Sequence, residues 1–193
     1  MTNRLNPAKL LLLDRDGVIN FDSDHYIKSA NEWQAIPGSL ETIAKLNKIS
    51  VDIIVVTNQS GLGRGLFDKN ALDEIHEKMH QELSLLNGSI KDIFFCPHTP
   101  TDACNCRKPK TGLLEAIEKK YGVSLSGVPF IGDSRKDLQL AYEKSCLPIL
   151  VKTGKGNDYF KTQFTSDPWH DQSLIFSTLN DAGNYLIRHT FNG

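Results

Sequence analysis

Short apolar runs alternate along this chain with longer segments that have the features of helices. The predicted strands are Leu10–Leu13, Asp52–Val56, Ile93–Phe95, Val128–Ile131, Pro148–Val151 and Leu174–Phe176. Helices are predicted over Ser39–Lys48 (with Ser39 as the cap), Lys69–Leu86, Thr111–Tyr121 (ended by Gly122), Ser134–Lys144 and Leu179–Arg188. Brief apolar runs bounded by turns are typical of parallel strands buried on both faces. The alternation therefore predicts right-handed β-α-β units in a three-layer, Rossmann-like α/β sandwich with a mostly parallel sheet.

The length of 193 residues fits one domain, spanning 1–193, that is large enough to bury a core without disulfides. The segment from Gly154 to Asp171 is polar and aperiodic, and we expect a surface loop there. No connection between the predicted elements is long enough to fold as a second domain. We therefore expect a minimal cap and an active site open to solvent, with room for a substrate whose bulk projects outward.

Charge and cysteine placement narrow the class of protein. A net charge of -1 argues against a protein that binds the nucleic-acid backbone. No apolar stretch approaches the ~20 residues needed to span a bilayer, and Met1 to Lys9 lacks the features of a secretory signal. Cys96, Cys104 and Cys106 share one short loop, which in a reducing compartment favours a metal site over a disulfide. The predicted location is the cytoplasm.

Two carboxylates, Asp14 and Asp16, follow the first predicted strand directly, and the chain then turns at Gly17. In an open α/β sheet, ligands bind at the carboxyl ends of the strands. Carboxylates this close repel each other unless they hold a cation or share a proton, and an aspartate can also attack phosphorus as a nucleophile. The alternative is a solvated β-turn, in which Asp and Gly are ordinary residues.

Polar residues end the other strands as well. The Thr57 hydroxyl and the backbone N–H groups after it could bind phosphate oxygens, and Lys108 could neutralise the charge of a transferring phosphoryl group. Asp133 follows the strand Val128–Ile131. Taken singly, these residues also fit a capped loop start, a solvated lysine and a helix N-cap. Together, three carboxylates, a hydroxyl and an ammonium supply what Mg²⁺ and a transferring phosphoryl group require.

The loop after the third strand contains Cys96, His98, Cys104 and Cys106. These two closely spaced ligand pairs fit a tetrahedral Cys₃His zinc site that leaves no position for water, so its predicted role is structural. The alternative is a set of free thiols. We expect the zinc to hold the loop that carries Arg107 and Lys108 to the active site.

The order of these motifs resembles the haloacid dehalogenase superfamily of aspartate-nucleophile phosphatases, and within it the heptose bisphosphate phosphatases. The resemblance rests on Asp14–Asn20, Val56–Gly61 and Cys104–Pro109, and it extends from about Leu10 to Thr153. It implies an Mg²⁺-dependent phosphatase that removes the 7-phosphate from D-glycero-D-manno-heptose 1,7-bisphosphate, in ADP-heptose and lipopolysaccharide core synthesis. It also implies zinc in the cysteine loop. We expect a monomer that acts on a small phosphorylated sugar.

The resemblance also assigns roles to residues. Asp14 would be the nucleophile, and Asp16 would act first as acid and then as base. Thr57 and Lys108 would hold the phosphoryl oxygens, while Mg²⁺ would be bound by Asp14, the Asp16 carbonyl and Asp133. The implied substrate-binding residues are Asp22, His25, Asn58, Gln59, Ser60 and Arg107.

Other functions stay open at this point. The short gap from His98 to Cys104 is similar to that of histidinol-phosphatases, whereas Val18 favours the heptose enzymes. A polynucleotide 3′-phosphatase, a phospho-accepting module without turnover and a zinc-dependent interaction domain are further alternatives. The heptose enzymes often have lysine where this chain has Ser134, and either Arg135 or Lys136 is a candidate to replace that charge.

Overall fold

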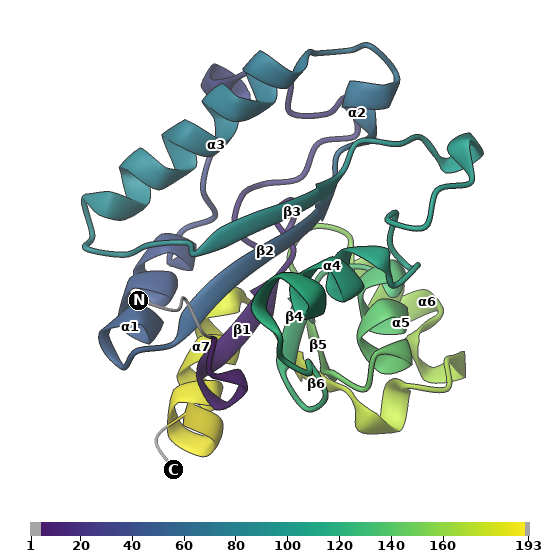
Figure 1. The fold of residues 1–193 in the computed structure, drawn as a ribbon. Helices are drawn as coiled ribbons and strands as arrows, with labels where there is room; N and C mark the ends of the chain where they lie inside the picture. Colours follow the sequence, from purple (N-terminus) through teal and green to yellow (C-terminus); the bar gives the residue numbers. More distant parts are fainter. Residues whose placement is uncertain (1–4, 192–193) are drawn as a thin grey trace.

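A computed structural model describes residues 5–191, so the start of the stretch Met1–Lys9 lies outside it. Its centre is a sheet with the strand order β3-β2-β1-β4-β5-β6, in which every neighbouring pair is parallel (Figure 1). The strands are β1 (Leu10–Leu13), β2 (Asp52–Asn58), β3 (Asp92–Cys96), β4 (Pro129–Gly132), β5 (Leu147–Val151) and β6 (Leu174–Phe176). The predicted parallel α/β architecture is confirmed.

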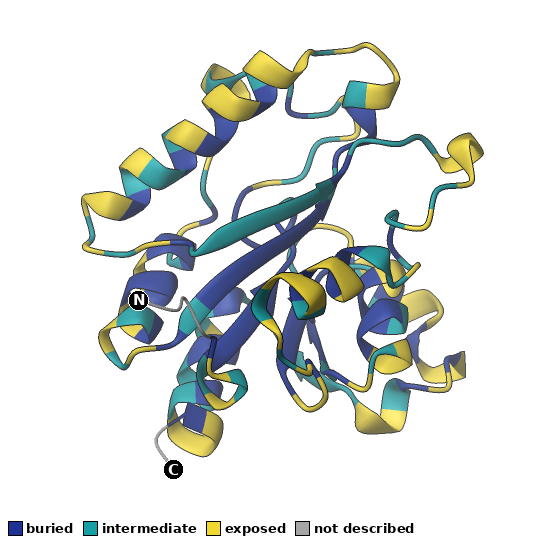
Figure 2. Cartoon of the chain, in the orientation of Figure 1, coloured by how far each residue is buried: buried dark blue, intermediate teal, exposed yellow. Residues whose placement is uncertain are grey.

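Helices cover both faces of this sheet. On one face, α1 (Ser39–Lys48), α3 (Lys69–Ser84) and α7 (Leu179–Leu186) pack against Leu11 and Leu13. On the other face, α4 (Gly112–Tyr121) and α5 (Arg135–Glu143) pack against Leu10 and Leu12. The central strands are buried and the outer sides of the helices are exposed (Figure 2). Because successive side chains of a strand point to opposite faces, the continuous leucine run of β1 supplies both cores.

Strand β2 is longer than predicted. Thr57 and Asn58, which were predicted to follow the strand, are its last residues and pair with Phe95 and Cys96 of β3. Their backbone is therefore fixed by the sheet. The short helix α2 (Ser60–Gly63) then follows, an element that the sequence analysis did not predict.

The prediction of a surface loop from Gly154 to Asp171 is wrong. This segment contains α6 (Gly156–Thr162) and 3-10 turns at Phe164–Ser166 and His170–Gln172. Tyr159, Phe164 and Trp169 are buried in a small apolar cluster of their own. Because the segment combines a short helix with 3-10 turns, its three buried aromatic residues follow no single helical or strand period.

Helix boundaries also differ in places. Ser39 does not cap α1; Gly38 holds that position with a φ of 84°, and the Ser39 hydroxyl donates to the Ile19 carbonyl oxygen at 2.6 Å. Helix α3 ends at Ser84, and α7 continues into a π-helical turn over Ile187–Phe191. Within residues 5–191, the structure has no helix whose length and hydropathy would let it cross a bilayer.

Candidate active site

A cavity of about 400 Å³ opens at the carboxyl ends of the central strands. Because β1 lies between β2 and β4, the residues that follow these strands meet at one edge of the sheet. The cavity brings together most of the predicted site: Asp14, Asp16, Asp22, Thr57, Asn58, Gln59, Ser60, Arg107, Lys108 and Asp133. His25 does not line it; this exposed side chain borders a neighbouring depression.

Asp14 lies where β1 ends, and its backbone N–H donates to the Ile131 carbonyl oxygen of β4 at 2.9 Å. Its carboxylate accepts the Arg15 backbone N–H at 2.7 Å and lies 2.8 Å from Lys108 Nζ. Burial raises the pKa of Asp14 to about 7, although the Lys108 ammonium favours the ionised form. The carboxylate is thus oriented at the cavity floor by two donors.

Lys108 is buried among acceptors that come from three separate parts of the chain. Its Nζ lies 2.8 Å from Asp14, 2.6 Å from Asp137 and 2.9 Å from the Val56 carbonyl oxygen. Burial by itself would lower the pKa of this lysine, but the two carboxylates raise it above its ordinary value. Lys108 is therefore a fixed positive charge beside Asp14.

Asp137 is a buried residue of this site to which the sequence analysis gave no role. It is fully buried, and its second oxygen accepts the hydroxyl and the backbone N–H of Ser134, at 2.5 and 3.1 Å. Ser134 is therefore the N-cap of α5, and the alternative reading of Asp133 as that cap is wrong. The signal that could have found Asp137 is the spacing Ser134-x-x-Asp137, which is typical of a capping box.

Asp133 is held from a different side. The Lys155 backbone N–H donates to its carboxylate at 2.8 Å. Gly17 and Gly154, which have φ values of 80° and 52°, lie so close to this carboxylate that a Cβ on either would overlap it. Burial and the charges of Asp137 and Asp14 raise the pKa of Asp133 well above its ordinary value. The two glycines are thus required by the packing of one carboxylate.

Carboxylate oxygens of Asp14, Asp133 and Asp137 lie within 4.8 Å of one another. Three carboxylates against the single ammonium of Lys108 leave an excess of negative charge in a buried place, which a divalent cation with oxygen ligands would balance. This donor set fits a magnesium-type site. The Asp16 side chain does not belong to the set.

The Asp16 carboxylate is instead held by a second group of donors. Arg15 Nη2 lies 2.9 and 3.0 Å from its two oxygens, Asn20 Nδ2 lies 2.9 Å away and Gln59 Nε2 lies 2.8 Å away. Burial would raise the pKa of Asp16, but the Arg15 charge and these hydrogen bonds bring it below its ordinary value. Asp16 is therefore ionised in this state.

Polar residues at the end of β2 connect the site to the loop after β3. Asn58 accepts the Lys108 backbone N–H at 3.0 Å and donates to the Lys108 carbonyl oxygen at 3.2 Å. The Thr57 hydroxyl is buried and accepts a hydrogen bond from Gln59 at 2.9 Å. Gln59 lines the cavity, but its amide binds Asp16, Thr57 and Arg15 of the protein itself.

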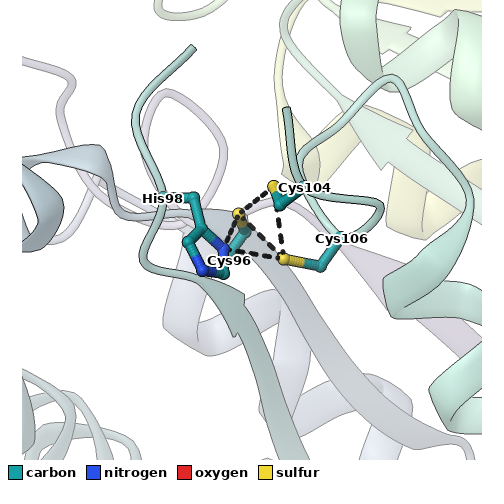
Figure 3. Close-up of side chains that lie close together, drawn as sticks. All are labelled: Cys96, His98, Cys104 and Cys106. Atoms are coloured by element: carbon teal, nitrogen blue, oxygen red, sulfur yellow. Dashed lines mark hydrogen bonds between the residues drawn. The ribbon is translucent and has the colours of Figure 1, made fainter. Parts of the chain in front are cut away.

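The four predicted zinc ligands converge (Figure 3). The Sγ atoms of Cys96, Cys104 and Cys106 lie 3.1–3.7 Å apart, and His98 Nδ1 lies 3.6 Å from Cys96 Sγ and 3.2 Å from Cys106 Sγ. Thiolates bound at about 2.3 Å to a tetrahedral zinc have similar separations. The donor set and its spacing therefore fit such an ion. Arg107, next to this cluster, donates to the His98 carbonyl oxygen at 3.2 Å.

The residues after Ser134 have distinct partners. Arg135 is bound to Asp167, with nitrogen–oxygen distances of 2.6–3.0 Å, and its guanidinium lies over the Trp169 ring. Lys136 is exposed and lines the cavity, where partial desolvation and the nearby Arg107 charge lower its pKa. Lys155 also lines the cavity, and it pairs with Asp22 at 3.1 Å. Arg135 and Lys136 were the two candidates to replace the lysine that is absent at Ser134. Of these two, only Lys136 forms no ion pair with a carboxylate in the part of the chain that the structure describes.

Comparisons with known proteins show the family of this chain. The family model described as polynucleotide kinase 3 phosphatase matches residues 9–164. A D-glycero-beta-D-manno-heptose-1,7-bisphosphate 7-phosphatase of Bordetella bronchiseptica is 52% identical over 77% of this chain and 83% of its own length. The protein of that name from Pseudomonas aeruginosa is 45% identical over 93% of this chain and 98% of its own.

A solved structure extends the likeness to three dimensions. The D,D-heptose 1,7-bisphosphate phosphatase from B. bronchiseptica, complexed with magnesium and phosphate, has a TM-score of 0.88 and 44% identity, and the match covers 93% of this chain and 98% of that one. The relatives are phosphatases, which hydrolyse phosphate monoesters. The chain therefore belongs both to the polynucleotide kinase 3 phosphatase family and to the heptose 1,7-bisphosphate 7-phosphatases of the haloacid dehalogenase superfamily, and it is a phosphoric monoester hydrolase.

Proposed function

We propose that this protein is an Mg²⁺-dependent phosphatase that removes the 7-phosphate from D-glycero-β-D-manno-heptose 1,7-bisphosphate. The observation that carries the proposal is the meeting of Asp14, Lys108 and Asp133 in one cavity, in a chain 52% identical to a relative of that name. The β anomer is proposed because the relatives at 42–52% identity carry it in their names. From the family resemblance we further propose that the reaction belongs to ADP-heptose synthesis, that it takes place in the cytoplasm, and that the protein is a monomer.

In the proposed reaction, an oxygen of Asp14 attacks phosphorus in line with the bond to the sugar oxygen. That bond breaks, and Asp16, which must first take up a proton from solvent or keep the one gained in the preceding cycle, gives that proton to the leaving alkoxide. The product at Asp14 is an aspartyl-phosphate. Asp16 then accepts a proton from water, which attacks the phosphorus and releases inorganic phosphate while Asp14 regains its carboxylate.

The phosphoryl oxygens need positive charge and donors throughout. Lys108 supplies a fixed ammonium 2.8 Å from Asp14, and Thr57 supplies a hydroxyl at the end of β2. Mg²⁺, bound by Asp14, Asp133 and the Asp16 carbonyl oxygen, would neutralise the remaining charge on the phosphoryl group. Asp137 would fix the position of Lys108 through their ion pair.

The rest of the substrate carries a second phosphate and several hydroxyl groups. We assign the second phosphate to Arg107 and Lys136, because Arg135 is already bound to Asp167. The remaining residues stay predicted contacts of the sugar, with His25 outside the main cavity: Asp22, His25, Asn58, Gln59 and Ser60. Lys136 would then supply the charge that is absent at Ser134.

We further propose that the cysteine cluster holds a structural zinc. The ion would fix the loop from Cys96 to Cys106, and hence the adjacent Arg107 and Lys108. Four protein ligands complete a tetrahedral site, so no position is available for a reacting water.

The experiment is a comparison of kcat/KM, with Mg²⁺ present, on the β and α anomers of heptose 1,7-bisphosphate, on histidinol phosphate and on an oligonucleotide with a 3′-phosphate. We expect the highest value for the β-bisphosphate. Preference for histidinol phosphate or for the oligonucleotide would overturn the substrate while leaving the phosphatase chemistry intact. Phosphorylation of the protein without turnover of any substrate would favour the phospho-accepting module.

A further inference from the structure

Arg15 is a buried arginine between the two site aspartates, and its side chain is 1% exposed. A guanidinium has five N–H donors and no acceptor, so its burial requires several acceptors around it. Besides Asp16, the structure supplies Gln59 Oε1, 3.0 Å from Nη2, and His76 Nε2, 3.3 Å from Nη1. Gln59 and His76 thus fix the position of the Arg15 guanidinium, which donates hydrogen bonds to both carboxylate oxygens of Asp16.

His76 comes from α3, far from the strand ends in sequence. Its neighbours on that helix, Ile75 and Met79, are buried in the core, which fixes where the imidazole lies. The ring packs tilted against Phe95 of β3, with the centroids 6.2 Å apart. The imidazole is therefore anchored by the fold and is independent of the loops that surround the cavity.

The imidazole accepts from Arg15. Because the guanidinium only donates, His76 Nε2 must offer a lone pair, which requires the neutral ring with its proton on Nδ1. Burial and the Arg15 charge lower the pKa of His76 to about 4, which keeps the ring neutral at physiological pH. A neutral partner leaves the positive charge of Arg15 directed at Asp16.

We propose that His76 and Arg15 are positioning residues that orient the Asp16 carboxylate for proton transfer to the leaving group. This inference rests on the acid–base role given to Asp16 in the proposed function. Proton transfer depends on the direction of the carboxylate lone pair as well as on its distance, so loss of one anchor of Arg15 should misdirect it.

The test is His76→Phe, which keeps an aromatic ring against Phe95 but removes the acceptor, with His76→Gln as the matched variant that restores an acceptor. kcat/KM is measured on heptose 1,7-bisphosphate and on p-nitrophenyl phosphate, whose leaving group departs without needing a proton. We expect His76→Phe to lose about 10–100-fold on the sugar phosphate and less than about threefold on p-nitrophenyl phosphate. His76→Gln should stay within about threefold of the wild type on both substrates.

An equal loss on both substrates would overturn the inference, because general loosening of the site does not depend on the leaving group. Unchanged kinetics of His76→Phe would overturn it as well. Should that variant fail to fold, as judged by thermal unfolding, Arg15→Lys provides the test: it keeps the charge but loses the two-oxygen grip, and the same selective loss is expected. A wild-type protein inactive on both substrates would instead remove the proposed function, and this inference with it.

Discussion

The ammonium of Lys108 lies 2.6 Å from a carboxylate oxygen of Asp137, and both side chains are buried, at 2% and 0% exposure. Asp137 belongs to the first turn of α5, whereas Lys108 belongs to the loop after β3. The ion pair therefore links the loop that follows β3 to the helix that follows β4. It also sets the position of the charge that faces Asp14.

The first prediction concerns this pair. Asp137→Asn leaves Lys108 with one buried carboxylate partner in place of two, and it weakens the cap of α5. Removing one partner of a buried pair costs about 3 kcal/mol, which urea unfolding would measure as a lower free energy of unfolding. The control is Asp73→Asn, whose partner Lys69 lies on the exposed face of α3. That variant should change the free energy by less than about 0.5 kcal/mol; equal effects of the two substitutions would contradict the prediction.

The second prediction concerns Asp16. Asp16→Asn keeps the shape of the side chain and the backbone carbonyl but removes the proton-transfer group, so kcat should fall by about 10²–10⁴-fold. The Mg²⁺ concentration for half-maximal activity should stay within about threefold of the wild-type value, because the carboxylate does not belong to the group of Asp14, Asp133 and Asp137. Steady-state rates over a range of Mg²⁺ concentrations measure both quantities. An undiminished kcat would remove the proposed mechanism.

The site was predictable from sequence to the extent that it follows strand ends. Asp14, Thr57 and Asp133 directly follow apolar runs, and a parallel sheet brings the ends of neighbouring strands together whatever the details of the loops. The zinc cluster was predictable because its ligands are close in sequence. Both signals are local, and both could be found in a single chain.

The remainder of the site depends on contacts between distant residues. His76 lies on an ordinary amphipathic helix, and nothing in its neighbours indicates that it meets Arg15. The same holds for Asp167, which binds Arg135 and Tyr159 inside a segment that looked like a polar loop. Such residues form hydrogen bonds with other polar groups that the fold buries. Which polar groups are buried, and therefore need a partner, is known only once the packing is known.

The third prediction concerns the cysteine cluster. Cys104→Ser should lose the zinc, measured by mass spectrometry of the purified protein, and should lower kcat/KM about tenfold, because a freed loop misplaces Lys108. Cys146→Ala is the control, since its sulfur is buried elsewhere and donates to the Leu125 carbonyl oxygen at 3.2 Å. That variant should keep its zinc and its kcat/KM. Zinc-free protein with full turnover and full stability would show that the loop needs no metal.

The last prediction concerns pH and the buried contacts of Asp167. Hydrogen bonds from Arg135, and one from the Tyr159 hydroxyl at 2.7 Å, hold the pKa of Asp167 below its ordinary value despite burial. A carboxyl whose pKa is lower in the folded state than in the unfolded state stabilises the fold above its unfolded pKa. That contribution disappears as the pH falls through the folded pKa. The stability difference between the wild type and Asp167→Asn should therefore be constant above about pH 5 and shrink steadily below about pH 4.

Urea unfolding at a series of pH values measures that difference. The matched control is Asp171→Asn, four residues further along, whose side chain is 85% exposed and lies 2.9 Å from His170 Nε2. This substitution removes an exposed carboxylate and no buried contact, so its stability relative to the wild type should change little across the whole pH series. If Asp167→Asn also followed a flat profile, Asp167 would titrate normally in the folded protein. The segment from Gly154 to Asp171 would then be held by its aromatic cluster and not by this carboxylate.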